Sequence, residues 1–361
     1  MSRSQSGRSV LLAALGFIMA ISAAPSPVRA EPVAEASDAD SDAEVIWRGP
    51  LRLRGQYPLD LPTLDLTPVD ARVLGAGEIS LEVLVVHSNT FELSPGFDAR
   101  ASDFDSGIFH PGWDFEVDSE STRLSVRADF GIGERWQLGI ELPIIAHAGG
   151  FLDSSVQSFH DATGLPNGDR EKRPNGNLNI DFISGNGRFA LDESDVTLGD
   201  VSVHAQVQFF RSRSSAFSGI VDIKAPTGDK ESLAGSGEWD YGVGVIGSIG
   251  GARNVFHGGI AHYFLGQPEL YPFDVDDRTS AYATYELIFN ERWSLCTQVL
   301  GATSILLDES ELDADKARVE LSVGAHHGSG PFEITFGFSE NLTSNDNNID
   351  LGLFFGAMWT L

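Results

Sequence analysis

The chain has 361 residues, a formal net charge of −28 and a hydrophobic fraction of 42%. This acidic balance argues against nucleic acid and anionic head groups as partners, because both would repel the chain as a whole. The single cysteine, Cys296, excludes an intramolecular disulfide, and no stretch after residue 30 approaches the roughly 18 consecutive apolar residues of a spanning helix.

Residues 1–30 have the pattern of a secretory signal peptide. Arg3 and Arg8 precede an apolar run over about 10–24, and residues 28–30 offer a small-residue cleavage site. The apolar run is too short for an uncleaved membrane anchor. We therefore expect an exported protein.

Residues 31–46 are small and acidic, and we predict a flexible acidic linker. The alternate acids from Asp38 to Glu44 resemble the start of a Ca²⁺ loop, but Ala43 stands where such a loop needs glycine. No metal site is predicted here.

Residues 47–76 combine seven leucines with four prolines, at positions 50, 58, 62 and 68. The segment is too apolar for a free linker and too rich in proline for a helix or a central strand. We hypothesise a periplasmic segment that folds against or into the mouth of the following domain as a small plug.

From residue 77 to 361 the dominant period is two, which is the period of a β-strand. In the clearest pair, over 123–146, apolar residues alternate with charged and polar ones on both sides of a turn at Gly133-Glu134. The same pattern predicts twelve strands: 77–92, 117–132, 134–147, 197–210, 215–226, 238–250, 254–266, 279–290, 291–303, 315–326, 331–341 and 349–361. Closed bacterial barrels have even strand numbers when both termini lie on the periplasmic side.

The connections between these strands alternate in length. The short ones are Gly133-Glu134, 211–214, 251–253, Asn290-Glu291 and 327–330, whereas the others are longer and hold most of the loop acids. Short periplasmic turns and long extracellular loops produce this alternation. We therefore predict an all-β fold: a single closed antiparallel up-and-down transmembrane β-barrel of about twelve strands in the bacterial outer membrane.

Several aromatic residues lie beside the short turns and the C-terminus, at strand positions whose side chains should point out of the barrel. This placement predicts an aromatic girdle at the membrane interface. Its members are Phe130, Trp136, Phe209, Phe217, Phe289, Trp293, Phe332 and Trp359.

Two segments resemble an outer-membrane barrel family known as domain of unknown function 3187. One runs from Gly49 to Leu59 and includes Pro50, Arg54, Gln56 and Pro58; the other comprises Lys224, Pro226, Thr227, Gly228, Asp229, Gly235, Gly237 and Asp240. Ala225 stands where a larger apolar residue is expected, a small departure. The resemblance covers about 47–361, implies an outer-membrane barrel and supplies no catalytic residues.

Charged residues at strand positions whose side chains should point into the barrel are the candidate lining of the lumen. They are Arg123, Arg127, Arg135, Glu141, Asp222, Lys224, Glu286, Arg318, Glu320 and Glu333. Mixed charges allow two outcomes: they line a water-filled channel, or they pair across the interior and close it.

Enzymatic and ligand motifs are weak. The glycine-rich loop 226–239 lacks the P-loop pattern, and its glycines are explained by a tight loop. The one His-x-Ser pair, His327 and Ser329, falls in a predicted turn without a base and an orienting group. We predict no catalytic, cofactor-binding or metal-binding residues.

The sequence favours a passive pore or uptake channel for small solutes. The alternative is a structural or surface-interaction barrel with a closed lumen, and an outer-membrane hydrolase ranks third. Expected partners are outer-membrane lipid and lipopolysaccharide, the barrel-assembly machinery during biogenesis and a small solute. Nucleic acid is not an expected partner.

Overall fold

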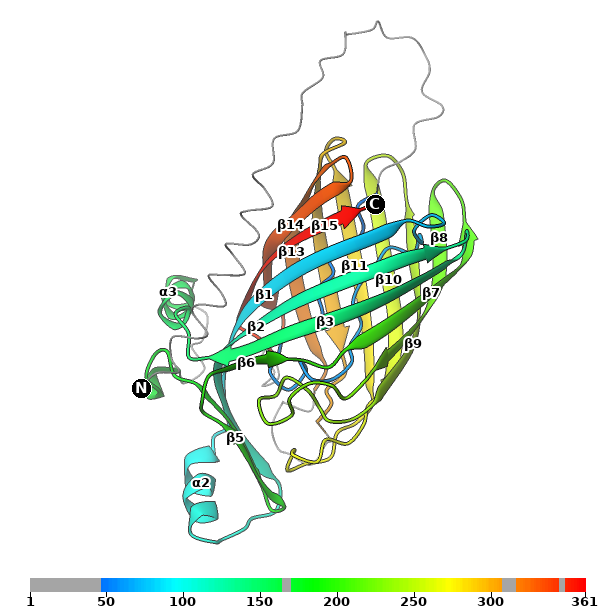
Figure 1. Cartoon of the computed structure of the whole chain (residues 1–361). Coiled ribbons are helices and arrows are strands. Elements are labelled where there is room, and N and C mark those ends of the chain that lie inside the picture. Colours follow the sequence, from blue (N-terminus) through cyan, green and yellow to red (C-terminus); the bar gives the residue numbers. More distant parts are fainter. Residues whose placement is uncertain (1–46, 164–169, 307–315, 344–347) are drawn as a thin grey trace, which may run out of the picture.

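The computed structural model describes residues 47–163, 170–306, 316–343 and 348–361. Its main feature is one antiparallel sheet in which twelve strands close into a barrel, as predicted (Figure 1). These strands are β1 (Ile79–Leu93), β2 (Trp113–Ile132), β3 (Trp136–Ala148), β7 (Ser202–Arg211), β8 (Ser215–Lys224), β9 (Asp240–Gly250), β10 (Asn254–Phe264), β11 (Arg278–Ile288), β12 (Trp293–Ala302), β13 (Arg318–Ser329), β14 (Phe332–Asn341) and β15 (Leu351–Thr360). The signal peptide and the acidic linker predicted for 1–46 lie outside the described residues.

The first and last strands close the ring. β1 pairs with β2 on one side and with β15 on the other, in a register that runs from Ser80 opposite Thr360 to Asn89 opposite Leu351. Closure leaves the twelve-stranded wall without an unpaired edge, which is what a lipid environment requires. On β2 the alternation sends Val126 outward, whereas Arg123 and Arg127 are buried inside.

One end of the barrel, here named the turn end, carries the short connections 133–135, 212–214, 251–253, 289–292 and 330–331. The predicted turn over 327–330 is displaced, because β13 continues to Ser329. Only Gly330 and Pro331 then connect it to β14, and Gly330 adopts φ +62°. A two-residue hairpin turn favours glycine in this left-handed conformation.

The opposite end, here named the loop end, is more elaborate than the sequence predicted. Within the long connection between β3 and β7 lie α3 (Asp153–Thr163), the 3-10 helix η1 (Arg170–Lys172) and the strands β4 (Asn179–Ser184), β5 (Gly187–Leu191) and β6 (Asp195–Leu198). The outer part of β2 pairs with β4, so the sheet projects beyond the barrel beside α2 (Phe97–Asp105) (Figure 1). No helix in the described ranges is long and apolar enough to cross a membrane.

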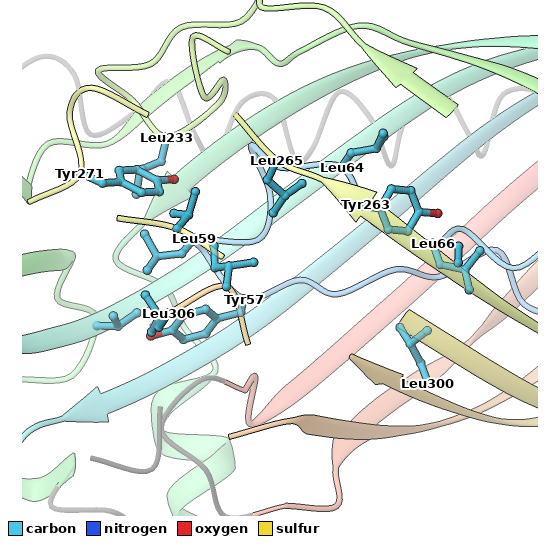
Figure 2. Packing of buried hydrophobic residues seen from close by; sticks show 14 of the residues in the cluster. Tyr57, Leu59, Leu64, Leu66, Leu233, Tyr263, Leu265, Tyr271, Leu300 and Leu306 are labelled. Carbon is cyan, nitrogen blue, oxygen red and sulfur yellow. The ribbon is translucent and has the colours of Figure 1, made fainter. Parts of the chain in front are cut away.

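Residues 47–76, here named the interior segment, form neither helix nor strand and pass through the inside of the barrel. Leu51, Leu59, Leu64 and Leu66 are each at most 2% exposed. Burial of one such side chain contributes about 1.5–3 kcal/mol. Figure 2 shows Tyr57, Leu59, Leu64 and Leu66 among apolar residues of the wall and the loops, so the largest apolar cluster of the barrel interior includes the interior segment.

Candidate functional site

The interior segment runs up the lumen and back. At the turn end, Trp47 Nε1 donates to Gly251 O (3.3 Å), and further in Gln298 Nε2 donates to Leu51 O (2.9 Å). The returning arm ends where Leu74 N donates to Gln137 Oε1 (2.9 Å), again at the turn end. Both ends of the segment therefore lie at the same mouth of the barrel.

The tip of the segment is a tight turn near the loop end. Asp60 N donates to Tyr57 O (2.8 Å), and Pro58 occupies the second position of this turn, where its fixed φ is favourable. Arg54 closes the tip, because its guanidinium donates to the carbonyls of Asp60 (2.8 Å) and Thr63. Arg54 and Pro58 thus explain part of the motif by which the segment resembles its family.

An ion-pair cluster joins this tip to the wall. Asp60 contacts both Arg278 of β11 and Arg318 of β13, and Asp65 lies 2.6 Å from Arg318 Nη2 and 3.7 Å from Arg278 Nη1. All four side chains are at most 4% exposed. Burial raises the pKa of Asp65, but the two guanidinium groups outweigh it and hold the pKa below its usual range.

A second set of contacts attaches the base of the segment at the turn end. Glu286 of β11 accepts from Arg48 N (3.2 Å) and Gly49 N (3.3 Å), and the Arg48 guanidinium pairs with Glu333 (2.9 Å). On the returning arm, Ala71 O accepts from Gln208 Nε2 (2.9 Å) and from Ser218 Oγ. Both arms are thus bound to the wall through polar groups.

Three residues at this level have the spacing of a catalytic triad. Ser248 Oγ lies 2.8 Å from His257 Nδ1, and His257 Nε2 lies 3.2 Å from Glu286 Oε2. However, Ser248 Oγ also donates to Asp70 Oδ1 (3.0 Å) and accepts from Ala71 N (3.2 Å). All three side chains are at most 3% exposed, so the interior segment occupies the space that a substrate would need. No sequence motif indicated these three residues, because they lie on three different strands and are brought together only by strand pairing.

The rest of the inward wall carries internal ion pairs. Arg123 pairs with Glu141, and Arg127 pairs with Asp129 at 2.9 Å. A cavity of about 20 Å³ remains beside the interior segment, with Arg127, His204 and Gln206 among its lining residues. It has room for about one water molecule.

The glycine-rich loop 226–239 folds around one carboxylate. Asp200 accepts from Thr227 N (2.9 Å), Gly228 N (2.7 Å) and Ser236 N (2.9 Å), and Lys224 Nζ lies 2.6 Å from it. A Cβ on Gly228 would lie 2.7 Å from the carbonyl carbon of Gly199, so the loop requires glycine there. These motif residues therefore shape a loop around an acid of the chain itself.

Nine of the ten candidate lumen residues lie inside the barrel in the structure; eight are buried and Glu333 is partly buried. Arg135 differs, because β3 begins only at Trp136 and leaves Arg135 exposed in the turn 133–135. Asp60, Asp65 and Arg278 were missed by the sequence analysis. Arg278 stands one residue before the predicted strand 279–290, which was the only signal for it.

The eight aromatic residues assigned to the girdle all point away from the lumen. Phe130, Trp136, Phe209, Phe289, Trp293 and Trp359 are between 39% and 59% exposed, and Phe217 and Phe332 are partly exposed. Cys296 is buried against the interior segment, with Sγ 3.6 Å from Gly49 O. Among the described residues, no group of three or more His, Cys, Asp or Glu side chains could hold a metal ion.

A closed wall with an apolar exterior and ion pairs inside defines the class of outer-membrane β-barrels. A family model described as protein of unknown function DUF3187 matches residues 43–360, so the chain belongs to this family. No curated protein matches the chain.

Several solved structures match the chain, and one of them, with a TM-score above 0.5, shares its fold. An outer membrane channel from Pseudomonas putida F1 has a TM-score of 0.55 and 14% identity, with 82% of this chain and 100% of that chain covered. A Pseudomonas aeruginosa FadL homologue has a TM-score of 0.34 and 8% identity, with 79% and 89% covered. The translocator domain of the autotransporter NalP from Neisseria meningitidis has a TM-score of 0.42 and 10% identity, with 79% and 89% covered.

Proposed function

We propose that the protein is an outer-membrane channel for small solutes, closed at rest by the interior segment acting as a plug. The observation that carries this proposal is the attachment of Asp60 and Asp65 to Arg278 and Arg318. The closing element is a separate piece of chain bound to a charged wall, and its departure would leave a lumen that water can fill.

The path of the segment supports its movement. Its ends, near Trp47 and Leu74, both lie at the turn end. It can therefore leave the lumen as a loop without being threaded through the wall. In this proposal the turn end faces the periplasm, as short turns do in outer-membrane barrels. The plug then leaves toward the periplasm, and the acidic loops meet lipopolysaccharide and its cations outside.

One observation favours the alternative, a structural barrel that never opens. Tyr57 and Leu59 at the tip of the segment belong to the same apolar cluster as Tyr271 and Leu306 of the long loops (Figure 2). Withdrawal would expose this apolar surface to water and would oppose opening.

Solute flux into liposomes decides between these functions. The variant Asp60→Asn with Asp65→Asn removes both acids that hold the tip, and we expect it to admit small sugars and amino acids that the unmodified chain excludes. Asp276→Asn, an exposed loop acid, is the matched control and should stay closed. If the double variant releases its plug to protease yet passes no solute, the barrel is structural.

A further inference from the structure

The turn end carries a set of arginines that have no part in the proposed plug or in its ion pairs with the wall. Four of the five short turns contain one: Arg135, Arg213, Arg253 and Arg292, and Arg211 ends β7 beside them. All five are exposed. In the part of the chain that the structure describes, the guanidinium groups of Arg135, Arg253 and Arg292 have no carboxylate partner, whereas those of Arg278 and Arg318 in the lumen are ion-paired.

Aromatic side chains accompany these arginines. Trp136 follows Arg135 and Trp293 follows Arg292, and both indoles are at least 39% exposed on the outer face. Aromatic rings of this kind lie at the level of lipid head groups. The cations are therefore at the height where lipid phosphates are found.

A bulge in β7 shapes a hollow at the same level. The register between β7 and β8 shifts between Gln208 and Phe210, so that both Phe209 (59% exposed) and Phe210 (49% exposed) face outward. With Arg135 and Arg211 they line a hollow of about 430 Å³ at the rim. Its lining combines aromatic surface for an acyl or glycerol moiety with two guanidinium groups and the carboxylate of Glu134.

We propose that this arginine belt, comprising Arg135, Arg211, Arg213, Arg253 and Arg292, binds anionic phospholipids through their phosphates in the leaflet at the turn end, with the hollow as its most enclosed site. Arginine matches phosphate oxygens with two parallel hydrogen bonds. The proposal rests on the membrane placement of the barrel but is independent of whether the lumen opens.

The net charge of −28 does not oppose this binding. Charges separated by more than about 8 Å are largely screened at physiological ionic strength. A phosphate at the turn end therefore responds to the charges nearest to it, which are the five guanidinium groups and the carboxylates of Glu134 and Glu291. The arginines outnumber these two acids. The net charge of the whole chain argued against anionic head groups as partners, and the proposal departs from that expectation at the turn end.

Tryptophan quenching by brominated lipids tests the site. In a Trp239→Phe background the exposed tryptophans are Trp136, Trp293 and Trp359, which all lie at the turn end, because Trp47 and Trp113 are 6% exposed. At physiological ionic strength we expect brominated phosphatidylglycerol to compete with phosphatidylcholine for these tryptophans with a preference of about fivefold, the effect of one arginine near a charged surface. High salt should abolish the preference.

The variant Arg135→Gln, Arg253→Gln and Arg292→Gln should lose this preference. Its matched control, Lys172→Gln, Lys230→Gln and Lys316→Gln, removes the same charge from the loop end and should keep it. Circular dichroism confirms that both variants are folded. Equal quenching by the two lipids in the unmodified chain, or equal loss in both variants, would overturn the proposal. Absence of quenching by either lipid would instead contradict the membrane placement itself.

Discussion

Arg278 and Arg318 are among the largest fully buried side chains of the described chain, and each pairs with acids more than 200 positions away in sequence. Arg318 also lies 3.3 Å from Glu320 on its own strand. A buried guanidinium loses its hydration, and only close counter-ions with good geometry restore that energy. Asp60 and Asp65 supply them from the interior segment. Breaking such a pair leaves an uncompensated charge, so the cluster links the stability of the wall to the position of the segment.

Asp65→Asn should therefore weaken the attachment of the interior segment. Loss of one partner in a buried ion pair costs about 3–5 kcal/mol, which corresponds to about a hundredfold or more in the population of the released segment. Trypsin cleavage after Arg54, which is 6% exposed, measures that population. The exposed control Asp276→Asn should be cleaved at the unmodified rate, and an unchanged rate in Asp65→Asn would show that the ion pairs do not hold the segment.

At the scale of elements, the twelve barrel strands could be predicted because lipid on one side and polar groups on the other impose a period of two along each strand. The strands β4, β5 and β6 escaped prediction because they are short and lie among loop residues at the end of the barrel. The interior segment has no periodic pattern at all. Its leucines and prolines indicated burial without a regular element, but its path depends on partners that chain order does not reveal.

Close packing at Gly55 gives a test of that path. A Cβ at this position would lie 2.1 Å from Arg318 Nη2, so Gly55→Ala must displace the guanidinium or the segment. We expect faster tryptic cleavage after Arg54, in the same direction as for Asp65→Asn. Gly251→Ala is the matched control, because a Cβ there would meet nothing within 4 Å. Equal cleavage of the two variants would mean that Gly55 does not lie against Arg318.

At the scale of the whole molecule, the barrel separates its surfaces by chemistry. Apolar side chains cover the outer wall, ion pairs fill the lumen together with the interior segment, and exposed arginines mark the turn end. A barrel of eight strands can fill its interior with side chains, whereas much larger barrels leave a channel. In this twelve-stranded barrel the interior segment fills the part of the lumen that side chains of the wall do not reach.

The outer wall should tolerate no charge at its middle. Val245 on β9 is 53% exposed, and Val245→Arg should lower the free energy of unfolding in lipid vesicles by about 2–4 kcal/mol, the cost of an arginine at the bilayer midplane. Denaturant titration followed by tryptophan fluorescence measures it. Ile108→Arg, on an equally exposed loop residue, should have almost no effect. Similar small effects at both positions would indicate that the outer wall faces water.

Single-channel conductance in planar bilayers tests the plugged channel most directly. The unmodified chain and a control lacking residues 31–46 should both remain closed, because each keeps the interior segment. Deletion of 47–70 should give steady openings of one uniform size, since it removes Asp60 and Asp65 and leaves the arginine-lined wall to water. If the deleted chain is folded and inserted but conducts no more than the unmodified chain, the interior segment is not what closes this barrel.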